Sequence, residues 1–224
     1  MKNFELNPDF AIADEQSLRA LFGATHTLAI QKCQTSLGKH AQEFISRSPF
    51  LCIGTQNPDG KADVSPRGDP VGFVKILDDE TLAIPDRPGN NRLDTLVNIL
   101  ANPNVGILFI IPGFDDTLRV NGRATLVTDP ELLATMSVNE RAPKLAIVVK
   151  VSEVFMHCAK AFRRSHLWSP EHLQDRSEMP SLVKIILDET TGAPSDKEEM
   201  RKMDDDLEED YKRTRSLSTK DSYS

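Results

Sequence analysis

Two arginines and two asparagines lie in a turn-forming stretch between an apolar run and a helix-like segment, within IPDRPGNNRLDTLVNIL at residues 84–100. A helix N-terminus presents free backbone N–H groups and the positive end of the helix dipole. Guanidinium groups add a fork of donors that fits phosphate oxygens. The stretch therefore predicts a phosphate site formed by Arg87, Asn90, Asn91 and Arg92. The alternative is that an asparagine caps the helix while the arginines are solvated.

A second stretch, DVSPRGDPVGF at residues 63–73, places polar side chains around a break between two expected strands. Prolines on both sides of an Arg-Gly pair hold the backbone rigid and irregular, which an ordinary surface hairpin does not need. Asp69, like Asp94 further along, is expected to cap a helix or to pair with a nearby arginine. The candidate binding residues of this stretch are Ser65, Pro66, Arg67 and Asp69.

A third candidate lies on an expected strand, in DTLRVNGRATL at residues 116–126. Side chains alternate between the two faces of a strand. Leu118 and Val120 therefore share one face, and Arg119 and Asn121 share the other. Arg119 could face a ligand or water, and the pattern leaves both interpretations open.

A fourth stretch, VFMHCAKAFRRSHLW at residues 154–168, follows a long expected strand. Residues three and four positions apart lie on one side of a helix. Lys160, Arg163 and Arg164 would therefore form a basic face, with the ring of Trp168 beside it.

The chain is expected to form three parts. Residues 1–48 predict an N-terminal helical arm, because cap residues and helically spaced apolar residues recur there. Short strand-like runs and turns follow, and a helix ending before Pro103 lies between the fourth and fifth strands. This order predicts a mainly β fold in residues 49–192, an antiparallel barrel that is closed or nearly closed and has flanking helices. Residues 193–224 are highly charged and predict an exposed helix or a disordered extension.

Composition narrows the class of protein. The 224 residues contain no apolar run long enough to span a membrane, and the N-terminus lacks a secretory or mitochondrial signal pattern, so a cytoplasmic protein is expected. A formal charge of −7 argues against non-specific nucleic-acid binding. The three cysteines have no metal-ligand spacing, so neither a metal site nor a disulfide scaffold is expected.

Taken together, four motifs resemble the pyridoxamine 5′-phosphate oxidase-like family of FMN-binding split barrels, and within it a subgroup of uncharacterised flavoproteins. The motifs are VSPRGDP, IPDRPGNNRLDTLVNILANPNVGILFIIPG, TLRVNGRA and HCAKAFRRSHLW. The resemblance spans about residues 20–185. It implies a homodimer of six-stranded, Greek-key-like antiparallel split barrels, with two FMN molecules at the subunit interface. By this resemblance, FMN phosphate contacts residues 87–92, the flavin ring lies near residues 65–69, and residues 160–168 reach the partner's flavin.

Some features of the family are missing. Pyridoxamine 5′-phosphate oxidases carry a Ser-Arg-Lys run at the phosphate helix and an Arg-Leu signature near the C-terminus, and this sequence has neither. Pyridoxal phosphate synthesis is therefore not expected. The resemblance implies an FMN-dependent oxidoreductase acting on an unidentified small molecule. The alternative is a binding or storage protein for FMN, haem or a deazaflavin.

The sequence assigns little of the chemistry to named residues. FMN would supply the redox reaction, and the protein would bind and orient it. A cation near the pyrimidine side of the flavin would stabilise its reduced form, and Arg67 is preferred over Arg119 for this role. No catalytic acid or base can be named. No GxGxxG motif follows a strand, so NAD(P)H as electron donor would have to bind transiently over the flavin.

Overall fold

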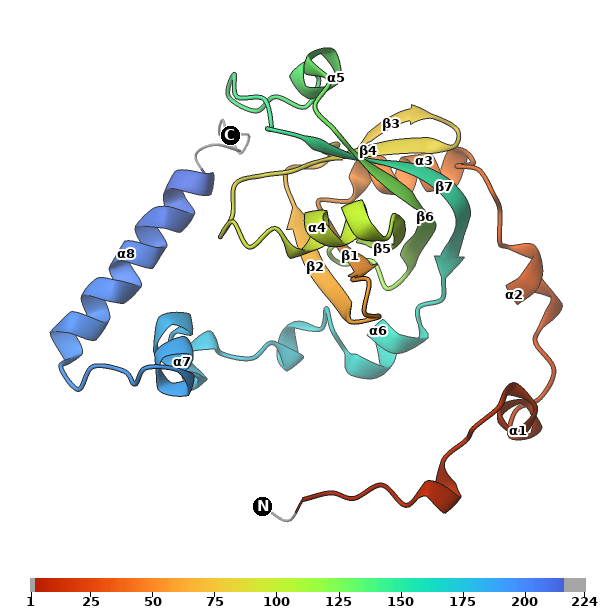
Figure 1. Cartoon of the computed structure of the whole chain (residues 1–224), viewed down its shortest axis with the longest axis horizontal. Helices are drawn as coiled ribbons and strands as arrows, with labels where there is room; N and C mark the ends of the chain where they lie inside the picture. Colours follow the sequence, from red (N-terminus) through yellow and green to blue (C-terminus); the bar gives the residue numbers. More distant parts are fainter. Residues whose placement is uncertain (1–2, 216–224) are drawn as a thin grey trace. The chain divides into compact units, whose positions relative to one another are not determined.

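The computed structural model describes residues 3–215 and divides the chain between Cys33 and Gln34 into two compact units. In the first unit every described residue is exposed. Its short helices are η1 Pro8–Phe10, α1 Glu15–Ala20 and α2 Thr27–Gln31. The second unit contains the sheet and the remaining helices (Figure 1).

The second unit is built on one antiparallel sheet in the order β2-β1-β5-β6-β7-β4-β3. The predicted mainly β class with flanking helices is confirmed, but the prediction of six strands is wrong, because the sheet has seven. Strand β3 is a short edge strand that forms a hairpin with β4. It begins only at Lys75, because Gly72, with a φ of +81°, lies in a turn before it. The strands are β1 Phe50–Gln56, β2 Ala62–Gly68, β3 Lys75–Asp78, β4 Thr81–Pro85, β5 Asn104–Ile110, β6 Thr117–Val127 and β7 Ala146–His157.

Helices flank the sheet and fill the connections between strands. Helix α4, which connects β4 to β5 as the sequence predicts, packs against β1, β2 and β6. Helix α3 contacts β6 and β7, and helices α7 and α8 contact each other. The helices of this unit are α3 Lys39–Arg47, α4 Asp94–Ala101, α5 Pro130–Ala134, α6 Lys160–Ser165, η2 Pro170–His172, η3 Arg176–Glu178, α7 Leu182–Glu189 and α8 Lys197–Arg215.

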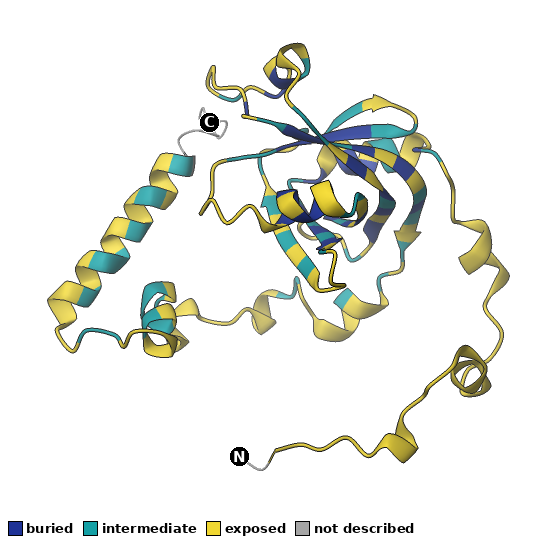
Figure 2. Ribbon diagram, in the orientation of Figure 1, coloured by how far each residue is buried: buried dark blue, intermediate teal, exposed yellow. Residues whose placement is uncertain are grey.

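The core lies on one face of the central strands, where alternate side chains are buried (Figure 2). Leu51 and Ile53 of β1 are completely buried, and Leu118 and Val120 of β6 lie in the same cluster. Burying an aliphatic side chain of this size stabilises the fold by about 1.5–3 kcal/mol. The inward row therefore fixes the register, and the intervening residues are left for the opposite face.

A bulge interrupts the longest strand pair, β6 with β7. Asn121 pairs with Glu153 and Gly122 pairs with Val151, so Ser152 is the extra residue on β7. A Cβ atom on Gly122 would overlap the carbonyl oxygen of Lys150. Only glycine therefore allows the two backbones to approach this closely.

Candidate functional site

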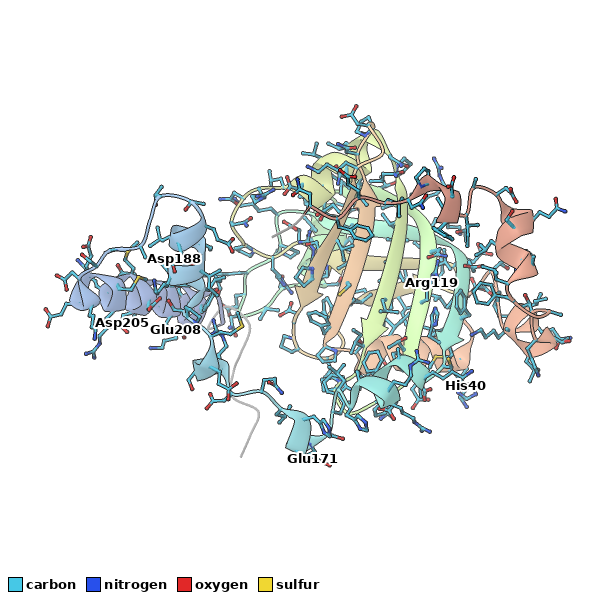
Figure 3. The ribbon with its side chains drawn as sticks, turned by 90° about the horizontal axis from the view of Figure 1, so that it is seen from below. His40, Arg119, Glu171, Asp188, Asp205 and Glu208 are labelled. Carbon is cyan, nitrogen blue, oxygen red and sulfur yellow. The ribbon has the colours of Figure 1, made fainter. Side chains whose placement is uncertain are left out.

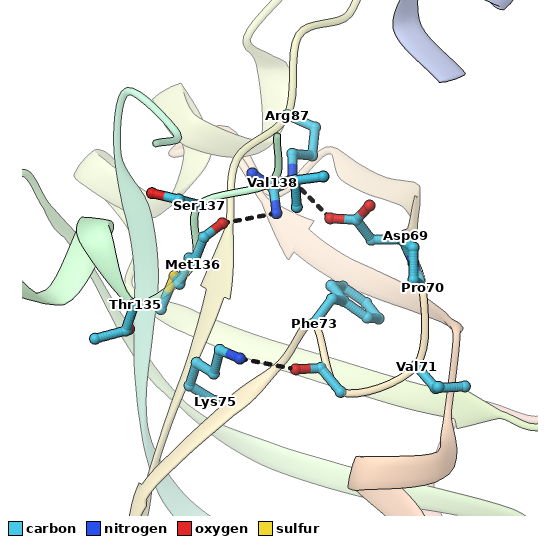
Figure 4. A pocket seen from close by; sticks show the side chains of 11 residues that line it. Asp69, Pro70, Val71, Phe73, Lys75, Arg87, Thr135, Met136, Ser137 and Val138 are labelled. Carbon is cyan, nitrogen blue, oxygen red and sulfur yellow. Dashed lines mark hydrogen bonds and ion pairs between the residues drawn. The ribbon is translucent and has the colours of Figure 1, made fainter. Parts of the chain in front are cut away.

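The two loop stretches singled out by the sequence are linked by two crossed ion pairs. Arg67 Nη1 lies 2.8 Å from Asp86 Oδ1, and Arg87 Nε lies 2.6 Å from Asp69 Oδ2. The Asp69–Arg87 pair is drawn in Figure 4. The expectation that Asp69 pairs with a nearby arginine is therefore confirmed. We call these four residues the seam.

The seam joins opposite ends of the sheet. Strand β2 is one end of the strand order, and β4 is next to the other end, formed by β3. No ladder pair joins β2 to β3 or β4 in the described residues, so backbone pairing does not close the sheet there. The side chains of the seam nevertheless hold the end of β2 against the residues that follow β4. The sheet therefore curls until its ends meet through ion pairs.

The seam is largely withdrawn from water. The side chain of Asp69 is only 3% exposed, and that of Arg87 is 25% exposed. Arg87 Nη2 also donates a hydrogen bond to the carbonyl oxygen of Met136, at 2.9 Å. Arg67 and Asp86 are each 19% exposed. Within the described part of the chain, Arg67 Nε is the one buried side-chain nitrogen or oxygen that has no hydrogen-bond partner.

The turn before α4 has an unusual backbone. Asn91 and Leu93 both adopt left-handed conformations, with φ of 58° and 61°. Such conformations cost about 1 kcal/mol or more for residues other than glycine, and they tend to occur at functional sites. Leu93 is the N-cap residue of α4 and provides no side-chain cap. The alternative of an asparagine cap is therefore not found, and no side-chain cap covers the start of α4.

Arg92 lies in this turn with its side chain in water. Its backbone N–H donates to Asn90 Oδ1 at 3.1 Å, and its Nε lies 2.8 Å from Asp94 Oδ2. The arginine side chain is 73% exposed. The hydrogen bond to Asp94 raises the pKa of the Arg92 guanidinium above its ordinary value. Water screens an ion pair this exposed, so Asp94 can readily be displaced from Arg92.

Two polar contacts, one buried and one partly buried, fix α4 in place. Asn98 Nδ2 donates to Thr55 Oγ1 of β1 at 3.0 Å, and Thr95 Oγ1 donates to Asp63 Oδ2 of β2 at 3.2 Å. No motif in the sequence marked these residues or Asp86 as candidates. One signal was available for Asp86, because the order Arg-x-Asp in one stretch and Asp-Arg in the other allows crossed pairing.

The two cations proposed to lie near a flavin ring are on opposite faces of the sheet. Arg67 pairs in register with the buried Leu51, so it belongs to the inward row. Arg119, labelled in Figure 3, alternates with the buried Leu118 and Val120 on β6 and is exposed. Its guanidinium lies 5.5 Å from the ring centroid of Phe155. One ring bound to one face therefore cannot meet both cations within a single chain.

The other two candidates on β2 are likewise separated. Ser65 pairs with Ile53 and lies in the same inward row as Arg67, whereas Pro66 pairs with Cys52 and lies on the outward face. Ser65 is half-buried and Pro66 is exposed. The structure therefore brings Ser65 and Arg67 together and directs Pro66 to the other side.

The C-terminal candidates divide into two groups. Arg163 pairs with Asp115 at 3.0 Å, and the indole N–H of Trp168 donates to the carbonyl oxygen of Phe114 at 2.8 Å. Both residues are therefore held by the turn between β5 and β6 of their own chain. Lys160 and Arg164 are exposed on α6.

A small hollow of about 150 Å³ borders the seam (Figure 4). Its walls include Asp69 and Arg87 on one side and Met136 on the other, with Phe73 and Lys75 also lining it. Pockets that enclose a drug-sized ligand measure about 300–1,000 Å³. The hollow is therefore too small to enclose a flavin.

Residues 3–215 contain neither a membrane-spanning helix nor a metal-binding cluster. No helix there is both long and apolar enough to cross a bilayer. No cluster of three or more His, Cys, Asp or Glu side chains in the same residues is arranged to hold a metal ion.

Comparison with known proteins places the chain in a family. Residues 37–158 match the family model described as pyridoxamine 5′-phosphate oxidase, and no curated protein matches. The match covers more than half of the chain and includes the seam and the start of α4.

Similar solved structures share little sequence with this chain. HupZ of Group A Streptococcus is 17% identical, with a TM-score of 0.44, covering 53% of this chain and 91% of its own. A putative pyridoxamine 5′-phosphate oxidase of Lactobacillus delbrueckii is 18% identical, with a TM-score of 0.43, covering 55% of this chain and 95% of its own. An FMN-binding protein of Syntrophomonas wolfei is 12% identical, with a TM-score of 0.41, covering 64% and 96%. On the strength of the family-model match, the chain belongs to the pyridoxamine 5′-phosphate oxidase family.

Proposed function

We propose that this protein is an FMN-binding flavoprotein that acts as a flavin-dependent oxidoreductase on a small molecule. The observation that carries the proposal is the start of α4, within the segment matched to the family. There an uncapped helix N-terminus, two left-handed residues and the exposed Arg92 occur together. A phosphate group is the guest that such a set of donors suits.

The donors at this turn fit a phosphate. The first backbone N–H groups of α4 have no side-chain acceptor at the N-cap, and Arg92 offers a guanidinium whose present partner is the exposed Asp94. Asn90 and Asn91 lie in the same exposed turn. In this proposal Arg92 exchanges Asp94 for the phosphate, because the dianion forms the stronger charge-assisted hydrogen bonds. Arg87 would act indirectly, by holding the turn against Asp69 and Met136.

The donor for the ring is assigned to Arg67. Its Nε–H is buried without an acceptor, and leaving such a donor unpaired costs about 1–3 kcal/mol. An acceptor on the pyrimidine side of FMN would remove that cost. FMN supplies the redox chemistry when bound, and the protein contributes binding, orientation and charge. Ser65 lies in the same inward row of β2 and would share this surface.

A second copy of the chain is proposed to complete the site. The hollow at the seam is too small for a flavin, so further walls are needed. The outward face of β2 carries Val64, which is 69% exposed, and the outward face of β6 carries Arg119. Lys160 and Arg164 of α6 are free to reach across an interface. A homodimer with FMN between its subunits would use these surfaces.

The test is the visible spectrum of the desalted protein after incubation with FMN, with the dissociation constant measured by flavin fluorescence. Arg92→Ala should weaken binding by about 10–100-fold, because a hydrogen bond to a charged group contributes about 1.5–3 kcal/mol. The matched control is Arg47→Ala, which removes an exposed arginine paired with Glu43 on α3. A wild-type protein without flavin bands, or equal binding by all three proteins, would contradict the proposal.

Turnover is tested separately from binding. If the loaded protein consumes NADH or NADPH in the presence of an electron acceptor, it is an oxidoreductase. Flavin binding without consumption of any reductant offered would favour a storage or binding protein. Titration with haem and with a deazaflavin in parallel shows whether FMN is the preferred guest.

A further inference from the structure

The four charges of the seam sum to zero. Arg67 and Asp69 stand two positions apart at the end of β2, while Asp86 and Arg87 are neighbours after β4. Each arginine is joined to the carboxylate of the opposite stretch. Arg67 and Arg87, two of the candidate binding residues, are therefore already compensated within the chain.

Asp86 is the fixed member of its pair. It directly follows Pro85, which is buried and pairs with Ala146 of β7. Its own backbone N–H donates to the carbonyl oxygen of Leu145 at 3.0 Å. Arg67, by contrast, extends from β2 at the end of the strand order. The long side chain is thus held by a short carboxylate anchored to the sheet.

The contact also leaves one buried donor of Arg67 without a hydrogen-bond partner. Asp86 accepts from Nη1, while Nε has no acceptor. The carboxylate therefore orients the guanidinium and at the same time lowers the positive potential around it. Both effects act at the group proposed to meet the flavin.

We propose that Asp86 is a positioning residue for Arg67 and that its negative charge lowers the reduction potential of the bound flavin. The inference rests on the proposed function, since it needs FMN near Arg67. A cation favours the anionic reduced flavin over the neutral oxidised form. Asp86 offsets that preference, so the ion pair as a whole affects the potential less than either charge alone.

Removing either charge should shift the midpoint potential of the bound flavin, with opposite sign in the two cases. Asp86→Asn keeps an oxygen that can accept from Arg67 but removes the compensating charge, so the midpoint potential should rise. Arg67→Gln leaves the carboxylate uncompensated, so the potential should fall. Asp86→Glu retains the charge and should stay close to the wild type. A merely structural contact would change stability without giving opposite shifts.

The experiment measures the midpoint potential of the FMN-loaded protein against a reference dye, together with the FMN dissociation constant. The matched control is Glu43→Gln, which removes the same unit of charge from the exposed Glu43–Arg47 pair. Urea unfolding of each apoprotein reports whether the fold is intact. If either Asp86→Asn or Arg67→Gln does not fold, the direction in which the potential shifts in the other variant tests the role of Asp86.

The outcomes separate this inference from the proposed function. Opposite shifts, with Glu43→Gln and Asp86→Glu unchanged, support the role of Asp86. Bound flavin whose potential does not move, or moves in the same direction in both variants, overturns the role of Asp86 alone. A wild-type protein that binds no flavin overturns the proposed function and this inference with it.

Discussion

Removing the carboxylate of Asp69 should destabilise the protein far more than removing the carboxylate of an exposed pair. Breaking a fully buried ion pair by deleting one partner costs about 3–5 kcal/mol, whereas exposed pairs contribute about 0–1 kcal/mol. Asp69 is 3% exposed and its partner Arg87 is 25% exposed, so Arg87 can recover part of its hydration. We therefore expect Asp69→Ala to lower the free energy of unfolding by about 2–3 kcal/mol.

The assay is urea unfolding followed by circular dichroism, with Glu43→Ala as the control. The side chains of Glu43 and Arg47 are 51% and 62% exposed, so this substitution should cost under about 0.5 kcal/mol. In a thermal scan the Asp69 variant should melt about 4–12 °C lower, at about 2–4 °C per kcal/mol for a chain of this size. Equal losses in the two variants would refute the conclusion that the seam holds the sheet ends together.

Three further outcomes are expected. Gly122→Ala should lower the free energy of unfolding by about 1–3 kcal/mol in urea, because its Cβ would overlap the Lys150 carbonyl oxygen, and an unchanged midpoint would contradict this. The hydrogen bond from the Glu80 N–H holds the pKa of Asp78 below its ordinary value. This hydrogen bond therefore stabilises the folded protein fully when the pH is above the ordinary pKa, and the stabilisation is lost as the pH falls through the lowered pKa. In urea, the free energy of unfolding of Asp78→Asn should therefore be lower than that of the wild type at pH 6, and the two should become similar in strong acid. A difference between the two proteins that does not depend on pH would count against this. Truncation after Gly192 should leave FMN binding and the oligomeric state unchanged, the latter measured as mass by light scattering, and loss of either would show that the extension is needed.

Local pattern was sufficient to predict most of the strands. The short strand-like run FLCIGTQ forms β1, and the NPDG turn after it closes a hairpin in which Gly60 adopts a φ of +82°. The helix before Pro103 forms as expected because a proline cannot continue it. These features depend on residues within a few positions of each other. Pairing of β1 with β5 and of β4 with β7 joins distant segments, and no local pattern encodes that choice.

In the candidate site, too, local features are predictable from the sequence and contacts between distant segments are not. The sequence identifies the charged turns, because the residue types and the prolines are visible in it. It does not identify their partners: Asp86 lies 19 positions from Arg67, and Asp69 lies 18 positions from Arg87. Which charge meets which depends on how the sheet curls. The left-handed Leu93 was also beyond prediction, because leucine has no preference for that conformation.

The strand order has a consequence for the growing chain. Strand β4 acquires its partner β7 only when residues 146–157 have been made, some 60 residues after β4 itself. Until then one edge of the β3–β4 hairpin has free N–H and C=O groups, which can pair with another chain. Synthesis that stalls in this interval would yield fragments prone to associate edge to edge. The last strand therefore protects the nascent protein from aggregation as well as completing its sheet.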